Sequence, residues 1–125
     1  MAPSVAYNGT LTLAFQVKNR KVSMEWYERV LGMSLLYEVE EIGWCELTTP
    51  VTGQTVTLGL SEVEAPRVGG PVPTFGVVDI DLARERLEAE GVRFDGKTVE
   101  ISGMVKLATF FDPDGNTLMF SQSLT

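Results

Sequence analysis

The stretch FQVKN at residues 15–19 decides the fold, because it returns as FGVVD at residues 75–79. The matched residues are Phe15, Val17 and Asn19 in the first copy and Phe75, Val77 and Asp79 in the second, an offset of 60. A helical stretch follows each copy and ends at a glycine, Gly32 or Gly91. Repetition on this scale indicates that one supersecondary unit is present twice.

Working outward from this stretch, each copy predicts the order βαβββ. Residues 10–17 alternate between polar and apolar types, which is typical of a half-buried strand, and three more strands are expected at 35–40, 42–48 and 55–60. Val22, Trp26 and Val30 recur every four residues and predict one face of a helix. The second copy predicts a strand at 74–78, a helix at 80–90 and three strands, the last at 117–122. We therefore expect an α+β fold of two modules, residues 1–64 and 74–125, joined by a Gly/Pro-rich linker at 65–73 into one structural domain.

Composition narrows the function classes. The chain has 125 residues and a net charge of −7, from 17 acidic and 10 basic residues. This balance argues against nucleic acid as a partner and is compatible with a cationic ligand. Residues 1–9 lack the features of a signal peptide, and no apolar run approaches the roughly 20 residues of a membrane span. With Cys45 as its one cysteine, the chain is expected to be cytoplasmic, without disulfides and without membrane contact.

Two motifs carry a resemblance to a known family. WYERVLGM at residues 26–33 and FFDPDGNTLMF at residues 110–120, in this βαβββ order, resemble the vicinal oxygen chelate superfamily. That superfamily includes glyoxalase I, extradiol dioxygenases, fosfomycin-modifying enzymes and bleomycin-binding proteins. The resemblance implies a curved eight-stranded mixed sheet around a central cleft, with the helices on the outer face. It also implies a homodimer, with modules paired either within one chain or across two.

The alternation along the strands predicts which side chains face this cleft. The apolar side chains of the first strand should lie toward the helices: Leu11, Leu13, Phe15 and Val17. Cys45 should face the helices as well, because it alternates with Trp44 and Glu46, which face the cleft. A ligand in the cleft is expected to contact Thr12, Gln16, Trp44, Glu46, Thr57, Thr74, Thr109, Phe111, Met119 and Ser121. Apolar walls with a few orienting polar groups are typical of sites that bind small molecules.

The resemblance also implies four metal ligands in the enzymes of the family, normally His, Gln or Glu. Carried over to this chain, they fall on Thr12, on Thr57 or Gly59, on Val72 and on Met119. Such side chains do not hold a hard divalent ion, and the chain contains no histidine. We therefore expect no metal and no cofactor, and no metal-dependent glyoxalase, dioxygenase or thiol transferase activity.

Three functions remain open from the sequence. The first is a metal-independent binding protein of the glyoxalase/bleomycin-resistance type that sequesters a hydrophobic or cationic ligand such as an antibiotic. The second is a metal-independent lyase, isomerase or cyclase that uses a carboxylate base, for which Glu46 is the candidate. The third is a regulatory or interaction domain with a vestigial cleft. The ligand itself is not identified by any motif.

Overall fold

The computed structural model describes residue 6 and residues 10–125, and it contains the predicted βαβββ order twice. The first module comprises β1 (Thr10–Val17), α1 (Arg20–Leu31), β2 (Ser34–Val39), the 3₁₀ turn η1 (Glu40–Ile42), β3 (Trp44–Thr48) and β4 (Thr55–Glu62). The second comprises β5 (Thr74–Gly76), α2 (Ile80–Ala89), β6 (Val99–Ile101), β7 (Val105–Phe111) and β8 (Thr117–Ser123). The predicted α+β class is confirmed.

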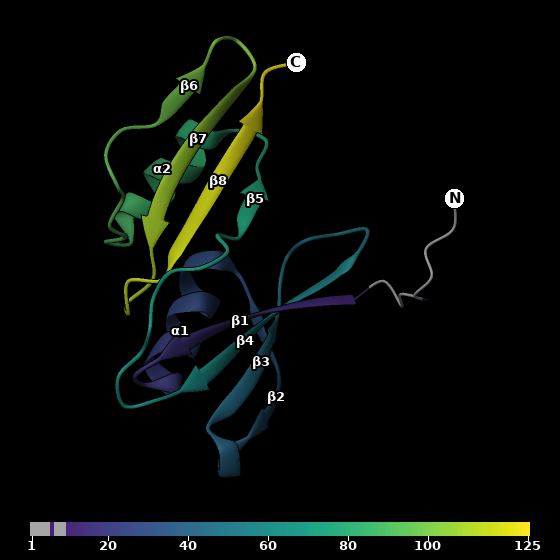
Figure 1. The fold of residues 1–125 in the computed structure, drawn as a ribbon. Helices are drawn as coiled ribbons and strands as arrows, with labels where there is room; N and C mark the ends of the chain where they lie inside the picture. Colours follow the sequence, from purple (N-terminus) through teal and green to yellow (C-terminus); the bar gives the residue numbers. More distant parts are fainter. Residues whose placement is uncertain (1–5, 7–9) are drawn as a thin grey trace.

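Hydrogen bonding divides the eight strands into two four-stranded sheets. Their orders are β1-β4-β3-β2 in sheet 1 and β5-β8-β7-β6 in sheet 2. The first strand of each module pairs parallel with the last, while the other neighbours pair antiparallel, so both sheets are mixed. Figure 1 shows one helix behind each sheet, with the other face of each sheet free of helices. The eight expected strands are thus present, as two sheets that repeat one design.

The helix-covered face of each sheet forms the core. Phe15 and Val17 are buried there, and Cys45 is fully buried, as the alternation predicts. Burial raises the pKa of the Cys45 thiol to about 11, which suits a packing residue rather than a nucleophile. Leu11 departs from the prediction and is 57% exposed. It lies near the start of β1, which projects beyond the helix in Figure 1.

Both helices begin and end largely as their sequences predict. The side chains of Asn19 and Asp79 accept hydrogen bonds from backbone N–H groups three residues later, each at 3.1 Å. Gly32 ends α1 in the left-handed conformation, with φ 69°. The predicted inner stripe of α1 is wrong at Val22, which is 53% exposed, whereas its neighbour Ser23 is buried. The inner face of α1 therefore includes Ser23, whose side chain has a polar partner in the second module.

That partner belongs to the hairpin turn between β7 and β8. The Ser23 hydroxyl donates to Asp114 at 3.2 Å, and the Tyr27 hydroxyl donates to Asp112 at 2.8 Å. Both contacts run from α1 of the first module to the turn of the second. On the opposite side, Arg29 of α1 forms an ion pair with Glu90 at the end of α2. These contacts hold the two modules together.

Within the described residues, neither helix is long and apolar enough to cross a membrane.

Candidate functional site

The helix-free face of sheet 1 carries a chain of hydrogen bonds that ends on a carboxylate. Trp44 Nε1 donates to the Tyr37 hydroxyl at 3.2 Å, and Tyr37 donates to Oε1 of Glu46 at 2.8 Å. From the other side, the Thr57 hydroxyl donates to Oε2 of Glu46 at 3.0 Å. The hydroxyls of Thr12 and Thr57 lie 2.8 Å apart, with Thr12 as the donor because the Thr57 proton points to Glu46. We call these five residues the Glu46 network.

The strand register brings the network together. Glu46 lies opposite Tyr37 on β2 and opposite Gly59 on β4, while Thr12 of β1 lies opposite Thr57. These pairs occupy one face, since Leu47 and Leu58 between them are buried on the other. Four distant segments therefore contribute to one polar surface.

Trp44 lies flat over Gly59. A β-carbon at position 59 would be 2.5 Å from Cζ2 of the indole, too close for any side chain to fit without moving the ring. Gly59 does not need a positive φ, so its role is to leave room. The ring covers the centre of sheet 1 and forms an aromatic surface beside the Glu46 carboxylate.

Arg20, the first residue of α1, holds the hairpin that carries Trp44. Its guanidinium is buried and binds Glu40 at 2.7 Å and Glu38 at 3.4 Å, and it donates to the backbone oxygen of Trp44 at 3.4 Å. Its backbone N–H donates to Glu62 at 2.8 Å. The buried arginine thus binds two carboxylates near the β2–β3 turn and holds the backbone of the hairpin at Trp44 from the helix-covered side of the sheet.

Gln16 forms hydrogen bonds away from the other predicted site residues. Its side-chain oxygen accepts a hydrogen bond from the backbone N–H of Arg67 at 2.8 Å, and its backbone oxygen accepts one from Asn116 at 3.1 Å. Gln16 therefore anchors the linker and the β7–β8 turn, and none of its recorded bonds joins the Glu46 network.

The predicted residues of the second module lie on the helix-free face of sheet 2. Met119 lies opposite both Thr74 and Thr109, and Ser121 is two residues further along β8. Phe111 is half-buried on the same face, with the guanidinium of Arg93 4.5 Å from its ring centroid. This surface is mainly apolar and hydroxylic, in contrast to the carboxylate-centred surface of sheet 1.

Within one chain, the two surfaces lie on separate sheets (Figure 1). Thr12, Trp44, Glu46 and Thr57 are joined by the Glu46 network, whereas the recorded hydrogen bonds of the described residues do not connect them to the sheet 2 set. The predicted residues thus lie on two separate surfaces of one chain.

The sequence matches the Glyoxalase/Bleomycin resistance protein/Dioxygenase superfamily over residues 10–120. The chain belongs to this superfamily. No curated protein matches the sequence. Solved structures share the fold, among them an integron cassette protein from the mobile metagenome of the Halifax Harbour sewage outfall, at 24% identity and a TM-score of 0.75, covering 93% of this chain and 99% of that one.

Two further structures of the superfamily fold are similar over nearly their whole length. One is a superfamily member from Sphaerobacter thermophilus, at 21% identity and a TM-score of 0.74, covering 95% of this chain and 98% of the other. Another is TnmS3, an antibiotic-binding protein from a Streptomyces species, at 20% identity and a TM-score of 0.71, covering 98% and 99%. At these identities the likeness shows the fold.

The residues at the metal positions implied by this superfamily do not suit a divalent metal. Thr12 and Thr57 are hydrogen-bonded to each other, and the space above Gly59 is filled by the Trp44 ring. Met119 offers a thioether, which is a poor ligand for a hard ion. Among the residues that the structure describes, no three His, Cys, Asp or Glu side chains cluster as metal ligands would. The chemistry of this face has to come from Glu46, hydroxyls and aromatic rings.

Sequence reasoning missed Tyr37, which links Trp44 to Glu46. Leu35 pairs with Leu47, but Tyr37 pairs with Glu46 because an irregularity in the register lies between them. Simple alternation puts residues 35 and 37 on the same face, so it cannot place Tyr37 beside Glu46. Arg20 was also missed, because buried arginines are rare and no local pattern marks its distant carboxylate partners.

Proposed function

We propose that this protein binds a small molecule without a metal, using the helix-free face of sheet 1 as the main recognition surface. The Glu46 network carries the proposal, because it places an indole ring beside a carboxylate whose two oxygens are held in position. A flat aromatic surface next to a negative charge suits an aromatic or apolar molecule that carries a positive charge, such as a cationic antibiotic.

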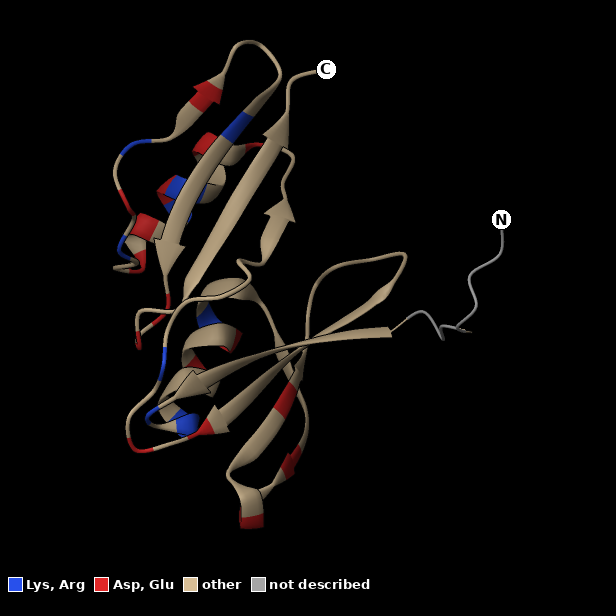
Figure 2. Ribbon diagram, in the orientation of Figure 1, with Lys and Arg blue, Asp and Glu red and all other residues tan. Residues whose placement is uncertain are grey.

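The charge distribution supports a cationic ligand. The four strands of sheet 1 contain neither lysine nor arginine, and of their three glutamates only Glu46 lies on the helix-free face, as Glu38 and Glu62 bind Arg20 on the other face (Figure 2). With a net charge of −7, the whole molecule attracts cations as well. The antibiotic-binding activity named for TnmS3 is compatible with sequestration as the purpose of such a site.

A matched pair of probes tests the proposal: quinoline and its cation N-methylquinolinium, with binding followed by tryptophan fluorescence. We expect the cation to bind roughly three to ten times more tightly, because only it gains the carboxylate and the cation–π contact. Glu46→Gln should remove that advantage, and added salt should reduce it in the wild type. In Trp44→Phe the quenching should be lost, while the remaining Trp26, on the other side of the sheet, stays unaffected.

If neither probe quenches Trp44, the proposed recognition surface is wrong. A different result would favour an enzyme. If Glu46→Gln leaves probe affinity intact but lowers the turnover of a substrate by roughly 10²-fold or more, Glu46 acts as a general base in a metal-independent reaction.

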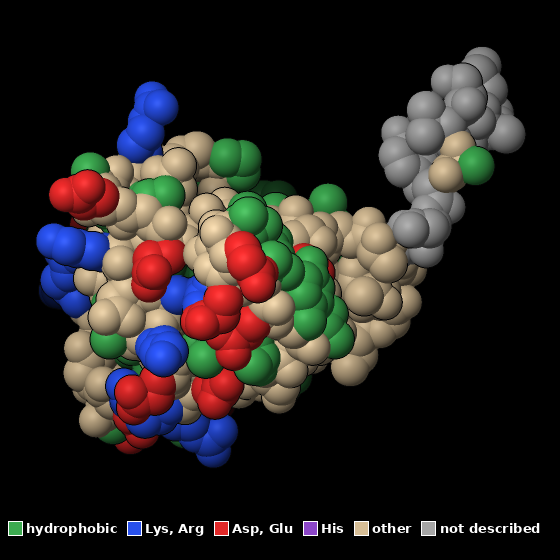
Figure 3. All heavy atoms as spheres, turned by 90° about the horizontal axis from the view of Figure 1, so that it is seen from below, with side chains coloured by type: hydrophobic (Ala, Val, Ile, Leu, Met, Phe, Trp, Pro, Cys, Tyr) green, Lys and Arg blue, Asp and Glu red, His purple; other side chains and the backbone are tan. Residues whose placement is uncertain are grey.

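We further propose that a second copy of the chain supplies the opposite wall of the site. Sheet 2 of a partner, with Met119 and Phe111, has the apolar surface that sheet 1 lacks. The edge of sheet 1 also exposes apolar side chains, since Leu36 of β2 is 51% exposed and Ile42 of the following turn η1 is 68% exposed. Figure 3 shows hydrophobic and acidic side chains side by side at this end of the molecule. An exposed apolar edge strand is a surface with which another chain can pair.

Sedimentation at micromolar concentration checks this: a homodimer is expected, and the mass of a single chain, 13.7 kDa, would contradict it. A cytoplasmic location also belongs to the proposal and fits the free thiol of Cys45.

A further inference from the structure

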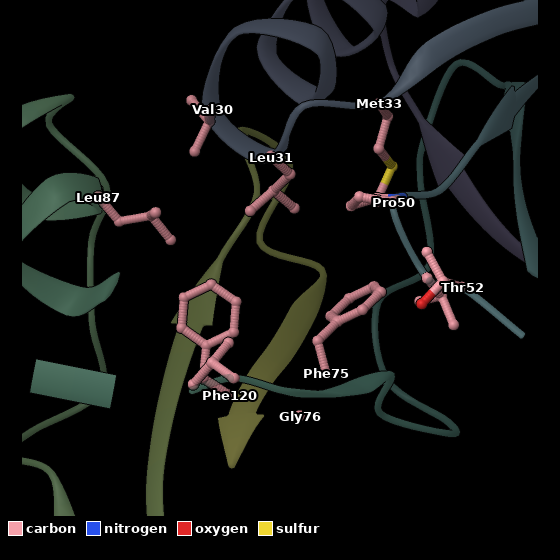
Figure 4. Close-up of a pocket in the computed structure, with 11 residues that line it drawn as sticks. Val30, Leu31, Met33, Pro50, Thr52, Phe75, Gly76, Leu87 and Phe120 are labelled. Atoms are coloured by element: carbon pink, nitrogen blue, oxygen red, sulfur yellow. The ribbon is translucent and has the colours of Figure 1, made fainter. Parts of the chain in front are cut away.

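A pocket of about 440 Å³ lies between the two modules, on the helix-covered side of sheet 2. Its floor is formed by the buried side chains of Met33, Leu87 and Phe120. Leu31 from the end of α1 and Phe75 from β5 form its walls, and Figure 4 shows these side chains directed toward a common space. We call it the inter-module pocket.

The inter-module pocket is separate from the Glu46 surface and from the predicted cleft. On β5, Phe75 lines the pocket, whereas its neighbour Thr74 faces the opposite side of the sheet. On β8, Phe120 lines the pocket whereas Met119 and Ser121 face the other way. The pocket and the predicted site residues of sheet 2 therefore lie on opposite faces of the same two strands.

None of the eleven described residues that line the inter-module pocket is charged. Its rim is formed by the loop between β3 and β4, where Val51 and the hydroxyl of Thr52 contribute. The burial falls from floor to rim, as in a pocket that a molecule enters from one side. The side chains that line it are mainly apolar, and its volume lies in the range of small-molecule sites.

We infer that the inter-module pocket is a second binding site, which takes one small, neutral, mainly apolar molecule. A charged ligand is disfavoured, because its charge would leave water and none of the lining side chains carries an opposite charge to offset that cost in free energy. Since Leu31 belongs to the first module and Leu87 and Phe120 to the second, a bound molecule would contact both modules and stabilise their packing.

The test uses Nile red, a neutral apolar dye whose emission rises in an apolar environment. We expect one dye per chain. Leu31→Trp should weaken dye binding by at least about tenfold, because the larger ring fills the space. The matched control is Val22→Trp, an equally large addition at an exposed position on the same helix, which should bind within about twofold of the wild type.

Val51→Asp provides a second variant that does not disturb the core, since Val51 lies in an exposed loop at the rim. A charge there should also weaken dye binding, whereas Val68→Asp in the exposed linker should not. Glu46→Gln should leave dye affinity unchanged, which separates this site from the proposed cation site.

Absence of dye binding to the wild type would overturn the inference. So would equal affinities of Leu31→Trp and Val22→Trp, or loss of dye binding in Glu46→Gln. A crystal of the protein under xenon pressure gives an independent measurement: xenon should lie between Leu31, Phe75 and Phe120, and its absence there would also contradict the inference.

Discussion

The two helices are equivalent in the repeat, yet their inner faces have different chemistry. At the offset of 60 residues, Ser23 corresponds to Ala83 and Tyr27 to Leu87. The hydroxyls of α1 reach the β7–β8 turn of the second module, where Tyr27 contacts Asp112. The corresponding residue of α2, Leu87, lines the inter-module pocket instead. At these matched positions α1 thus connects the modules through polar contacts, whereas α2 contributes an apolar side chain to a pocket that the end of α1 also lines.

The sheets differ in the same way. Sheet 1 carries the Glu46 network, whereas the corresponding surface of sheet 2 consists of threonines with Phe111 and Met119. A repeated backbone has therefore been given two complementary surfaces, one acidic and aromatic and the other apolar. The fold of each module therefore depends on the residues that the copies share, whereas the proposed binding depends on the positions at which they differ.

The largest effect is expected where α1 meets the second module. Asp112 accepts hydrogen bonds from Tyr27, from the Asn116 side chain and from the backbone N–H groups of Asp114 and Asn116, all at 2.8–2.9 Å. Asp112→Ala leaves buried donors unpaired and should lower the free energy of unfolding by about 3–4 kcal/mol. Urea denaturation measures this loss.

The matched control is Asp79→Ala, which removes only the cap of α2 and should cost about 1 kcal/mol. Equal losses in the two variants would mean that the Asp112 contacts do not carry the inter-module stability.

A second substitution tests the space beneath Trp44. Gly59→Val forces the indole off the sheet, so the unfolding free energy should fall by about 1–3 kcal/mol. In a Trp26→Phe background, the emission of Trp44 should shift to the red as the ring enters water. Gly76→Val on the corresponding face of sheet 2 meets no atom within 4 Å and should change stability by less than about 0.5 kcal/mol. Unchanged Trp44 emission in Gly59→Val would contradict the stacking.

Tyr27→Phe isolates one contact between the modules. It keeps the ring in the core and removes only the hydroxyl that donates to Asp112, so a loss of about 1–2 kcal/mol is expected. The effect should disappear in an Asp112→Ala background, because the hydroxyl then has no carboxylate to bind. A double-mutant cycle of urea midpoints gives the coupling, and additive losses would show that the contact is weak.

Much of the fold follows from short-range signals in the sequence. Gly32 at the end of α1 and the alternation around Phe15 each act within a few residues, so they can be recognised from the sequence alone. The turn DPDGN was also expected. Its role in binding α1 was not, because Tyr27 and Asp112 are 85 positions apart in the sequence and are brought together only by the packing of the modules.

The site was predicted less completely, for the same reason. Alternation placed Thr12, Glu46 and Thr57 on one face, but it could not show that their side chains bond to one another. The irregularity in β2 reversed the face of Tyr37, and Gln16 turned to the linker rather than to the network. Side-chain partners depend on register and on distant loops, which periodicity does not report.

The smallest effect is expected at Tyr37, and it sharpens the contrast between the sheets. Tyr37 is 43% exposed, so loss of its hydroxyl in Tyr37→Phe should change the unfolding free energy by less than about 0.5 kcal/mol. The same hydroxyl accepts from Trp44 and donates to Glu46, so its removal frees both groups to move. Binding of N-methylquinolinium should therefore weaken by about two- to fivefold, since part of the binding energy is spent on ordering them. The affinity for quinoline, which does not need the carboxylate, should fall less.

Titration of Trp44 fluorescence with both probes measures the difference between the two losses of affinity. Equal losses would show that Tyr37 supports the indole alone and does not position Glu46.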